Sequence, residues 1–207
     1  MKILLYGDSI TDMGRDRTVD CCPSSYGAGY SFVLQSKLSE RSPIEYTVIN
    51  RGISGNKTVD LYARLKGDVW NLNPDVMSIL IGVNDIWHEI EGNNGVDINR
   101  FEKTYRNIIE ETKEKLPNIK IMLLEPFVLH GVATTPKFEQ FTALYDYAKV
   151  VKRIADDYGL VFVPLQQKFD EEAKKYGEST LLYDGVHPTI AGSTIIANEW
   201  LKGFEKL

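Results

Sequence analysis

The sequence lacks the features that would assign it to a specialised class of protein. Only two of its 207 residues are cysteines, Cys21 and Cys22. Neighbours in sequence cannot staple distant segments together, so we expect two reduced thiols. No apolar run approaches the roughly 20 residues that span a bilayer. Lysine and arginine are scattered and the formal net charge is −5, which argues against nucleic acid as a partner.

Sequence motifs for metals and nucleotides are also missing. There is no HExxH sequence, no paired CxxC and no EF-hand loop, and Gly7 is not followed by the Lys-Ser/Thr ending of a phosphate-binding loop. The apolar stretch from Ile3 to Tyr6 lacks the length and the cleavage site of a signal peptide. We therefore expect no metal, no cofactor and no membrane attachment, and a cytoplasmic protein.

The remaining composition is that of an ordinary globular chain. Hydrophobic residues make up 43% and charged residues 26% of the sequence, and a chain of this length buries a sizeable core without disulfides or metals. There is no internal repeat, low-complexity tract or linker rich in proline and serine. We expect a single domain over residues 1–207.

Short apolar runs rich in β-branched residues alternate with amphipathic stretches. This alternation predicts an α/β fold in which helices cover both faces of a parallel sheet. Long polar loops follow the first and third runs, and ligands bind beyond the carboxyl ends of strands in such sheets. The five predicted strands are Lys2 to Tyr6, Tyr46 to Asn50, Val76 to Ile81, Lys120 to Leu124 and Val161 to Val163.

Three stretches carry apolar side chains at the three- and four-residue spacing of a helix that packs on a core. We expect the first to stop at Pro117, the second to end near Gly159 and the third to begin after Pro188. The stripes are Phe101, Tyr105, Ile108 and Thr112; Phe141, Leu144, Ala148, Val151 and Ala155; and Ile196, Trp200 and Phe204.

The first predicted strand ends in the segment GDSIT at positions 7–11. Gly7 allows a sharp turn that exposes Ser9 at the edge of the sheet. Taken alone, Ser9 is better explained as a helix N-cap, because Ser and Asp are favoured in such turns. A serine becomes a nucleophile only if a base takes its proton and a third group orients that base.

Three histidines are available as that base: His88, His130 and His187. His187 lies in the segment DGVHP at positions 184–188, where a compact turn can fold the carboxylate of Asp184 back onto the imidazole Nδ1. Asp184 would then set the tautomer and stabilise the imidazolium that forms when Ser9 is deprotonated. In isolation the same segment is also explained by an Asp that caps the last helix beside an exposed His.

Two further strand ends carry candidate hydrogen-bond donors, in NRGISGN at positions 50–56 and in GVND at positions 82–85. Attack on an ester creates an oxyanion, and each donor to it contributes roughly 10²- to 10³-fold in rate. We expect three donors: the N–H groups of Ser9 and Gly52 and the side-chain amide of Asn84. A tight turn at Gly52 and a helix cap at Asn84 are the structural alternatives.

These four segments resemble the signature blocks of the SGNH, or GDSL-type, hydrolases, and the likeness covers essentially the whole chain. The resemblance implies a flavodoxin-like three-layer α/β/α sandwich whose five-stranded parallel sheet has the order 2-1-3-4-5. It also implies Ser9, Asp184 and His187 as the catalytic triad and Ser9, Gly52 and Asn84 as the oxyanion hole. The Gly-x-Ser-x-Gly elbow of ordinary α/β-hydrolases is absent.

Positions 50–56, 81–87 and 125–127 look like those of bacterial intracellular acetylxylan esterases that act on short xylo-oligosaccharides. This likeness implies a small-molecule ester partner such as an acetylated oligosaccharide. That branch often carries Arg after the Trp, whereas His88 follows Trp87 here, which puts the acyl-acceptor specificity in question. Assembly into a homo-oligomer is left open.

Aromatic faces suit sugar rings or acyl groups, although core packing explains Phe127 equally well. Asp8, like Asp85, is also explained as a turn or cap former, because the side chains of adjacent residues diverge. Four candidates for substrate contacts lie in or beside the four segments, and the fifth lies in the stretch at positions 125–127: Asp8, Asn56, Trp87 and Tyr183, and Phe127.

Three other functions compete with a short-chain esterase. A lysophospholipase or thioesterase would use the same triad on a longer acyl chain. A carbohydrate-binding protein would keep the fold without turnover, although an intact Ser9, Asp184 and His187 argue against it. A glycosidase that pairs the carboxylates of Asp12 and Glu125 ranks third, because a triad is available.

Overall fold

A five-stranded parallel sheet forms the centre of the computed structural model, which describes residues 1–207. The strand order is β2-β1-β3-β4-β5, with helices on both sides, so the predicted α/β class, the parallel sheet and its order are confirmed. The strands are β1 (Lys2–Gly7), β2 (Thr47–Gly52), β3 (Val76–Leu80), β4 (Lys120–Leu124) and β5 (Val161–Val163).

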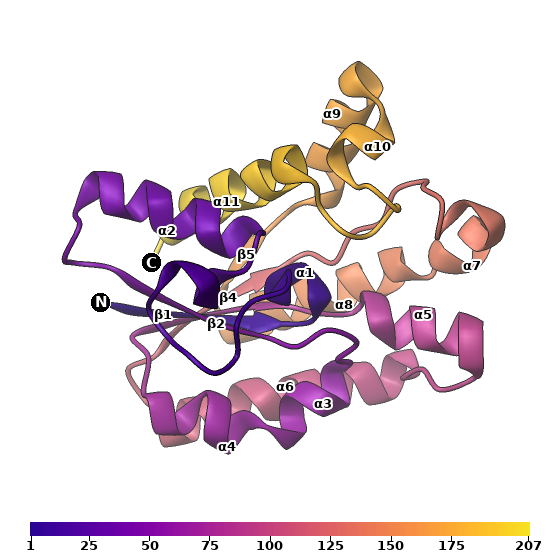
Figure 1. The fold of residues 1–207 in the computed structure, drawn as a ribbon. Coiled ribbons are helices and arrows are strands. Elements are labelled where there is room, and N and C mark those ends of the chain that lie inside the picture. The colour runs from indigo at the N-terminus through magenta and orange to yellow at the C-terminus, as the bar shows by residue number, and fades with distance from the viewer.

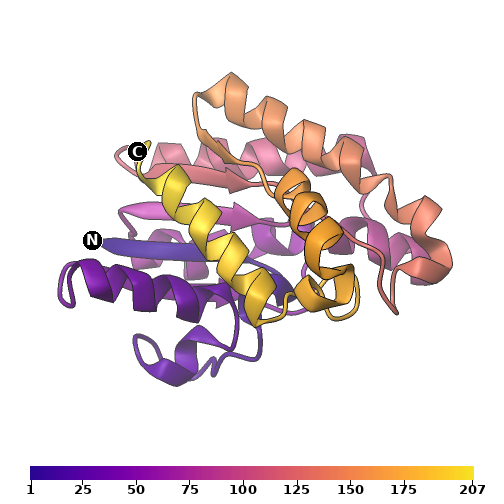
Figure 2. The same ribbon diagram turned by 90° about the horizontal axis from the view of Figure 1, so that it is seen from above.

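Helices cover the sheet on both faces. Helices α2 and α11 pack against each other above the sheet, and α3, α4 and α6 lie below it (Figures 1 and 2). The helices are α1 (Ser9–Asp12), α2 (Tyr30–Arg41), α3 (Thr58–Ala63), α4 (Leu65–Asp68), α5 (Val83–Gly92), α6 (Ile98–Lys115), α7 (Phe138–Phe141), α8 (Leu144–Tyr158), α9 (Gln166–Tyr176), α10 (Glu178–Leu181) and α11 (Ile190–Phe204), with short 3₁₀ turns at Pro23–Tyr26, Trp70–Leu72 and Thr135–Lys137.

The predicted helical stripes face the core, with one correction. All four members of the first stripe are buried on α6, which ends at Lys115, two residues before Pro117. The second stripe is divided, because α7 ends at Phe141 and α8 begins at Leu144. Helix α8 ends at Tyr158, and Gly159 caps it in a left-handed conformation, so the predicted end near Gly159 is confirmed.

One continuous cluster of 49 buried hydrophobic residues joins the sheet to the helices. Its largest member, Trp200 of α11, is fully buried, and its indole N–H donates to Ser78 Oγ on β3 at 2.9 Å. Thr189 caps the start of α11 by accepting the Gly192 N–H. Both cysteines are free thiols. None of the helices has the length and hydropathy needed to cross a bilayer.

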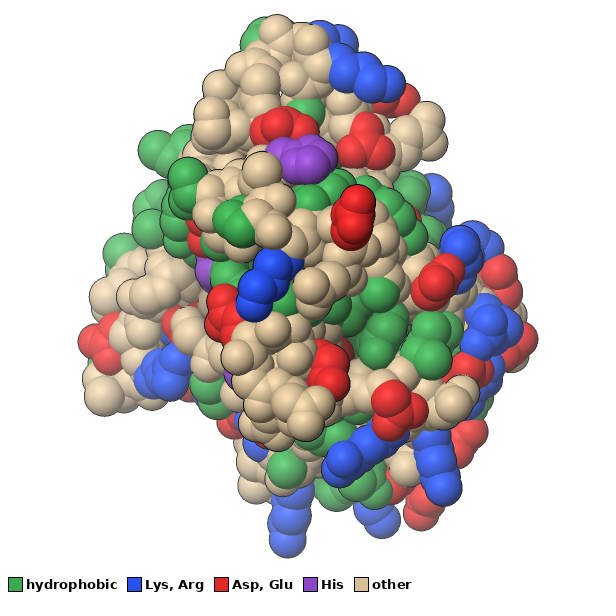
Figure 3. Space-filling model, turned by 90° about the vertical axis from the view of Figure 1, so that its right-hand side faces the viewer, with side chains coloured by type: hydrophobic (Ala, Val, Ile, Leu, Met, Phe, Trp, Pro, Cys, Tyr) green, Lys and Arg blue, Asp and Glu red, His purple; other side chains and the backbone are tan.

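The carboxyl ends of β1, β2 and β3 lie side by side, because Gly7 pairs with Gly52 on one side and with Leu80 on the other. The loops that follow these strands therefore meet at one edge of the sheet. Figure 3 views the molecule from this side: a histidine side chain lies in the upper part of the face with acidic side chains beside it, and most Lys and Arg side chains lie toward the rim.

Candidate active site

The sharp turn after β1 places Ser9 at the start of α1. A Cβ on Gly7 would overlap the Leu80 carbonyl, so this position needs glycine. Asp8 caps the short helix by accepting the Ile10 N–H at 2.9 Å. Ser9 is the first residue of α1, so its N–H has no intrahelical acceptor. Its hydroxyl Oγ lies 2.8 Å from His187 Nε2.

The turn at positions 184–187 holds the acid and the imidazole together. Asp184 Oδ2 lies 2.6 Å from His187 Nδ1, and Asp184 Oδ1 accepts the backbone N–H groups of Val186 and His187 at 2.9 and 2.8 Å. Gly185 has φ +101°, a conformation that favours glycine. An ionised Asp184 can only accept at Nδ1, so Nε2 of a neutral imidazole is the atom left to accept the Ser9 proton.

The pKa values of this pair move in opposite directions. The hydrogen bond that His187 donates to Asp184 raises the pKa of His187 above its usual value, against the opposing effect of burial. Burial alone would raise the pKa of Asp184, but hydrogen bonds from the His187 ring and from two backbone N–H groups lower it. Asp184 is therefore an anion at neutral pH, and its charge stabilises a protonated His187.

Asn84 is the second residue of α5, the helix that follows β3. Its side chain is 5% exposed, and its Nδ2 donates to the backbone carbonyl of Asn56 at 3.0 Å. This bond uses one of the two N–H groups of the amide and fixes its orientation. The second N–H is left for a ligand.

The prediction that Gly52 supplies an oxyanion donor is wrong. The Gly52 N–H donates to Asn50 Oδ1 at 2.8 Å, so this amide already has an acceptor inside the protein. A Cβ on Gly52 would overlap the backbone at Asp12. Gly52 thus serves the close approach of β2 to α1, a structural role different from the tight turn expected as its alternative.

The loop that follows β2 brings a different glycine to the site, one that the sequence reasoning missed. Ser54 donates its backbone N–H to Asp12 Oδ2 at 3.0 Å, and the Asn56 carbonyl holds Asn84. Gly55 therefore lies between α1 and the start of α5. It has φ +82°, and no atom within 4 Å would contact a Cβ there. The recognisable signal is a second glycine in the segment at positions 50–56.

Two buried carboxyl groups lie next to the expected catalytic residues. Asp8 is fully buried, and its Oδ2 has no hydrogen-bond partner. Asp85 is 1% exposed and accepts the N–H and hydroxyl of Thr58. Burial raises the pKa of both side chains to about 7. The prediction that Asp8 contacts substrate is wrong because no part of it is accessible; it is a cap, as its position in the turn also indicated.

The three aromatic candidates divide into two groups. Tyr183 is 54% exposed, and its ring stacks on that of His187 with centroids 5.6 Å apart. The partly buried Trp87 has its ring 6.0 Å from the His187 ring. Phe127 is fully buried and stacks on Phe169 at 4.4 Å. The prediction of a substrate contact is therefore wrong for Phe127, which is a core residue.

Asn56 and the glycosidase pair have structural partners. Asn56 Oδ1 accepts the Arg64 Nε–H at 2.8 Å, so its side chain points to that guanidinium. Asp12 pairs with Arg17 and with Ser54, and Glu125 accepts the first N–H groups of α9. The two carboxylates thus hold loops and a helix end, and nothing in their contacts supports the glycosidase alternative.

Comparison with known proteins identifies the family of this chain. Residues 5–195 match the GDSL-like lipase/acylhydrolase family. The chain is 37% identical to an acetylxylan esterase of Geobacillus stearothermophilus over 99% of this chain and 94% of that protein. The crystal structure of that organism's acetylxylan esterase Axe2 superposes with a TM-score of 0.87 at 35% identity, covering 98% of this chain and 93% of that one.

A second solved structure extends the likeness. A putative GDSL-like lipase from Parabacteroides merdae has a TM-score of 0.92 at 37% identity, covering 99% of this chain and 95% of that one. Identity of this extent over nearly the full length of both chains, with the same fold, shows common family membership. The chain belongs to the GDSL-like lipase/acylhydrolase family and is a carboxylic ester hydrolase.

Proposed function

We propose that this protein hydrolyses short acyl esters, principally acetyl esters of oligosaccharides, with Ser9, His187 and Asp184 as its catalytic triad. The observation that carries the proposal is the continuous hydrogen-bond chain from Ser9 Oγ to His187 Nε2 at 2.8 Å and from His187 Nδ1 to Asp184 at 2.6 Å. A nucleophile, a base and an orienting acid are already aligned before any substrate binds.

The mechanism is a two-step acyl transfer. His187 takes the Ser9 proton while Oγ attacks the ester carbonyl carbon, and the imidazolium then gives that proton to the departing alcohol oxygen. Water, deprotonated by the same imidazole, attacks the acyl-enzyme and releases the carboxylic acid, and His187 returns the proton to Ser9. Asp184 stays ionised throughout and stabilises the imidazolium.

The oxyanion is held by three donors in this proposal: the Ser9 N–H, the Gly55 N–H and the second amide N–H of Asn84. Gly55 replaces Gly52 because the Gly52 N–H is already bonded to Asn50. At the start of α1 the N–H of Ser9 is the one that meets the oxygen, because the three N–H groups that follow it donate to Asp8.

Two features support an acylated saccharide as substrate. Tyr183 offers a half-exposed aromatic face beside His187, and it also lines a groove of 590 Å³ together with His130, Thr135 and Glu178. An aromatic platform with polar neighbours suits sugar rings. The similar protein of Geobacillus stearothermophilus is an acetylxylan esterase.

A longer acyl chain is the competing proposal, and one observation favours it. A groove of 770 Å³ lined mainly by apolar atoms lies between the loop after α1, helix α2 and the start of α11. Phe32 and Ile190 line it and are 48% and 80% exposed. Such a groove could take the hydrocarbon of a lysophospholipid or thioester.

Substrate length separates the two proposals. We expect 4-nitrophenyl acetate to have a higher kcat/KM than 4-nitrophenyl octanoate, and Phe32→Ala to leave the acetate reaction unchanged. A clear preference for octanoate that Phe32→Ala abolishes would replace the acetyl proposal with the long-chain one. Acetate release from acetylated xylo-, manno- and pectic oligosaccharides then identifies the sugar.

Covalent labelling tests the triad itself. A fluorophosphonate should label Ser9 in the wild-type protein and should fail to label Ser9→Ala, whose ester hydrolysis is lost. Ser54→Ala is the matched control, because Ser54 is also on a loop of this edge but its hydroxyl bonds Asp12. Folded wild-type protein that escapes the label would favour the non-catalytic carbohydrate-binding alternative.

A further inference from the structure

One guanidinium group connects three of the segments that form the site. Arg64 lies between α3 and α4, and its side chain is 16% exposed. Its Nη2 donates to the Gly7 carbonyl at 3.0 Å and its Nη1 to the Arg51 carbonyl at 2.9 Å. These carbonyls belong to the last residue of β1 and the next-to-last residue of β2, directly before the loops that carry the proposed oxyanion donors.

The third contact of Arg64 reaches the oxyanion loop itself. Its Nε donates to Asn56 Oδ1 at 2.8 Å, and the backbone carbonyl of Asn56 accepts Asn84 Nδ2 at 3.0 Å. Asn56 is therefore the one residue that connects Arg64 to Asn84 by hydrogen bonds. Gly55 precedes Asn56, so the same bond also limits where the Gly55 N–H can point.

The guanidinium is held in its plane by groups that do not belong to the site. The ring of Tyr6 lies 4.4 Å from Arg64 Cζ, and the Tyr6 hydroxyl donates to the Leu61 carbonyl on α3. Asp68, one turn along, accepts Arg64 Nη1 at 2.6 Å and balances its charge. Three nitrogens in a rigid plane that donate to four separate acceptors are a pattern that a lysine ammonium cannot reproduce.

We propose that Arg64 is a positioning residue for ester hydrolysis. Its guanidinium keeps the ends of β1 and β2 and the Asn56 loop in the arrangement in which the Asn84 amide and the Gly55 N–H point at the ester oxygen. The inference rests on the proposed oxyanion hole. Arg64 touches no substrate; it acts through Gly7, Arg51 and Asn56.

Removal of the guanidinium should damage turnover more than binding. We expect Arg64→Ala to lower kcat for 4-nitrophenyl acetate by about 10²-fold, the cost of a misplacement of about 1 Å, while KM changes by less than about threefold. Arg64→Lys keeps the charge but loses the planar donors, so its kcat should stay well below that of the wild type.

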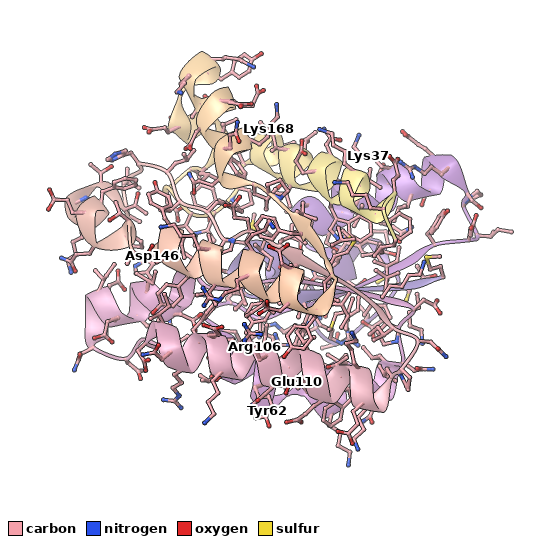
Figure 4. All side chains as sticks on the ribbon, turned by 180° about the vertical axis from the view of Figure 1, so that it is seen from behind. Lys37, Tyr62, Arg106, Glu110, Asp146 and Lys168 are labelled. Carbon is pink, nitrogen blue, oxygen red and sulfur yellow. The ribbon has the colours of Figure 1, made fainter.

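Chemical rescue distinguishes positioning from general destabilisation. Millimolar guanidinium chloride, far below the molar concentrations that unfold proteins, should restore the kcat of Arg64→Ala in a saturable manner. Arg106→Ala is the matched control. Arg106 lies on α6 (Figure 4), pairs with Glu102 and Asp157 and lies near the Tyr158 ring, but it touches no loop of the site, so its kcat should equal that of the wild type with or without the salt.

Each outcome decides the inference. A wild-type kcat in Arg64→Ala, an effect on KM alone, or a folded Arg64→Ala that guanidinium does not rescue would overturn it. If Arg64→Ala does not fold, Arg64→Lys decides: a wild-type kcat overturns the inference, and a reduced kcat at unchanged Tm and KM supports it. Turnover that survives in Ser9→Ala would instead refute the proposed function, independently of Arg64.

Discussion

Two carboxyl groups flank the candidate nucleophile, and their surroundings give them opposite properties. Asp184 accepts the imidazole N–H and two backbone N–H groups, which hold its pKa below the usual value although burial opposes this. Asp8, adjacent to Ser9, accepts the Ile10 N–H, and complete burial raises its pKa to about 7. The comparison shows that the number of donors, and not closeness to the serine, decides which carboxyl has the lowered pKa.

The largest effect should come from neutralising Asp184, the carboxylate that accepts three hydrogen bonds. Asp184→Asn removes the charge that stabilises the imidazolium and permits the wrong tautomer of His187, so kcat should fall by about 10⁴-fold. Asp8→Asn is the matched control, since it makes the same substitution one residue from Ser9, and it should keep most of the activity. Equal losses in the two variants, measured by steady-state hydrolysis of an acetyl ester, would contradict the assignment.

The next largest effect concerns a donor used in the transition state. Asn84→Ala should lower kcat by about 10²- to 10³-fold with little change in KM, because the amide interacts mainly with developing charge on the oxygen. The two constants are separated by initial rates over a range of ester concentrations. A rise in KM with an unchanged kcat would make Asn84 a binding residue.

Activity should fall at acid pH, because His187 becomes protonated there. A protonated imidazole cannot accept the Ser9 proton, and the pKa of His187 is raised by Asp184, so the loss should begin at a higher pH than for a free histidine. Below that pKa, kcat/KM should fall about tenfold per pH unit. Constant kcat/KM down to about pH 4 would exclude His187 as the base.

The smallest effect is on stability and concerns Asp8. Its pKa is near 3.8 when unfolded and about 7 when folded, so the folded state binds more protons between these values. The contribution of Asp8 to stability therefore decreases as the pH rises through this window and is constant above it. Asp8→Asn lacks this loss, so its Tm relative to the wild type should rise by a few degrees between about pH 5 and pH 8. A pH-independent difference in Tm would show that Asp8 is ionised in the folded protein.

The sheet could be predicted from the sequence because its signal is local. Each strand is a short apolar run bounded by turn residues, and the run at Val161–Val163 was placed at its observed bounds. The break between Phe141 and Leu144 was missed because apolar spacing continues across it, and a periodic pattern does not show where backbone hydrogen bonds stop.

The site was predictable where chemistry restricts the choice of residue and less so where backbone groups do the work. Three histidines left few candidates for a base, and the structure brings His187 to Ser9 and Asp184. Gly52 and Gly55 could not be distinguished in the same way, since only the Asn50 side chain shows which N–H is already bonded. Arg64 has no motif, because its contacts are with carbonyl groups that every residue possesses.

The turn that carries His187 is closed by its own backbone hydrogen bonds, and this affects how activity is lost when the protein begins to unfold. An antiparallel bridge between Leu182 and Pro188 and a bond from the Tyr183 N–H to the His187 carbonyl close it, so the acid and the base stay aligned by local contacts. The 2.8 Å contact to Ser9 joins residues 178 positions apart. Mild denaturant should therefore abolish ester hydrolysis by separating Ser9 from His187, the two halves of the proposed triad, while the imidazole still titrates as a group paired with Asp184. The rate of ester hydrolysis would then measure the fraction of molecules in which the hairpin that carries His187 is packed against the Ser9 turn.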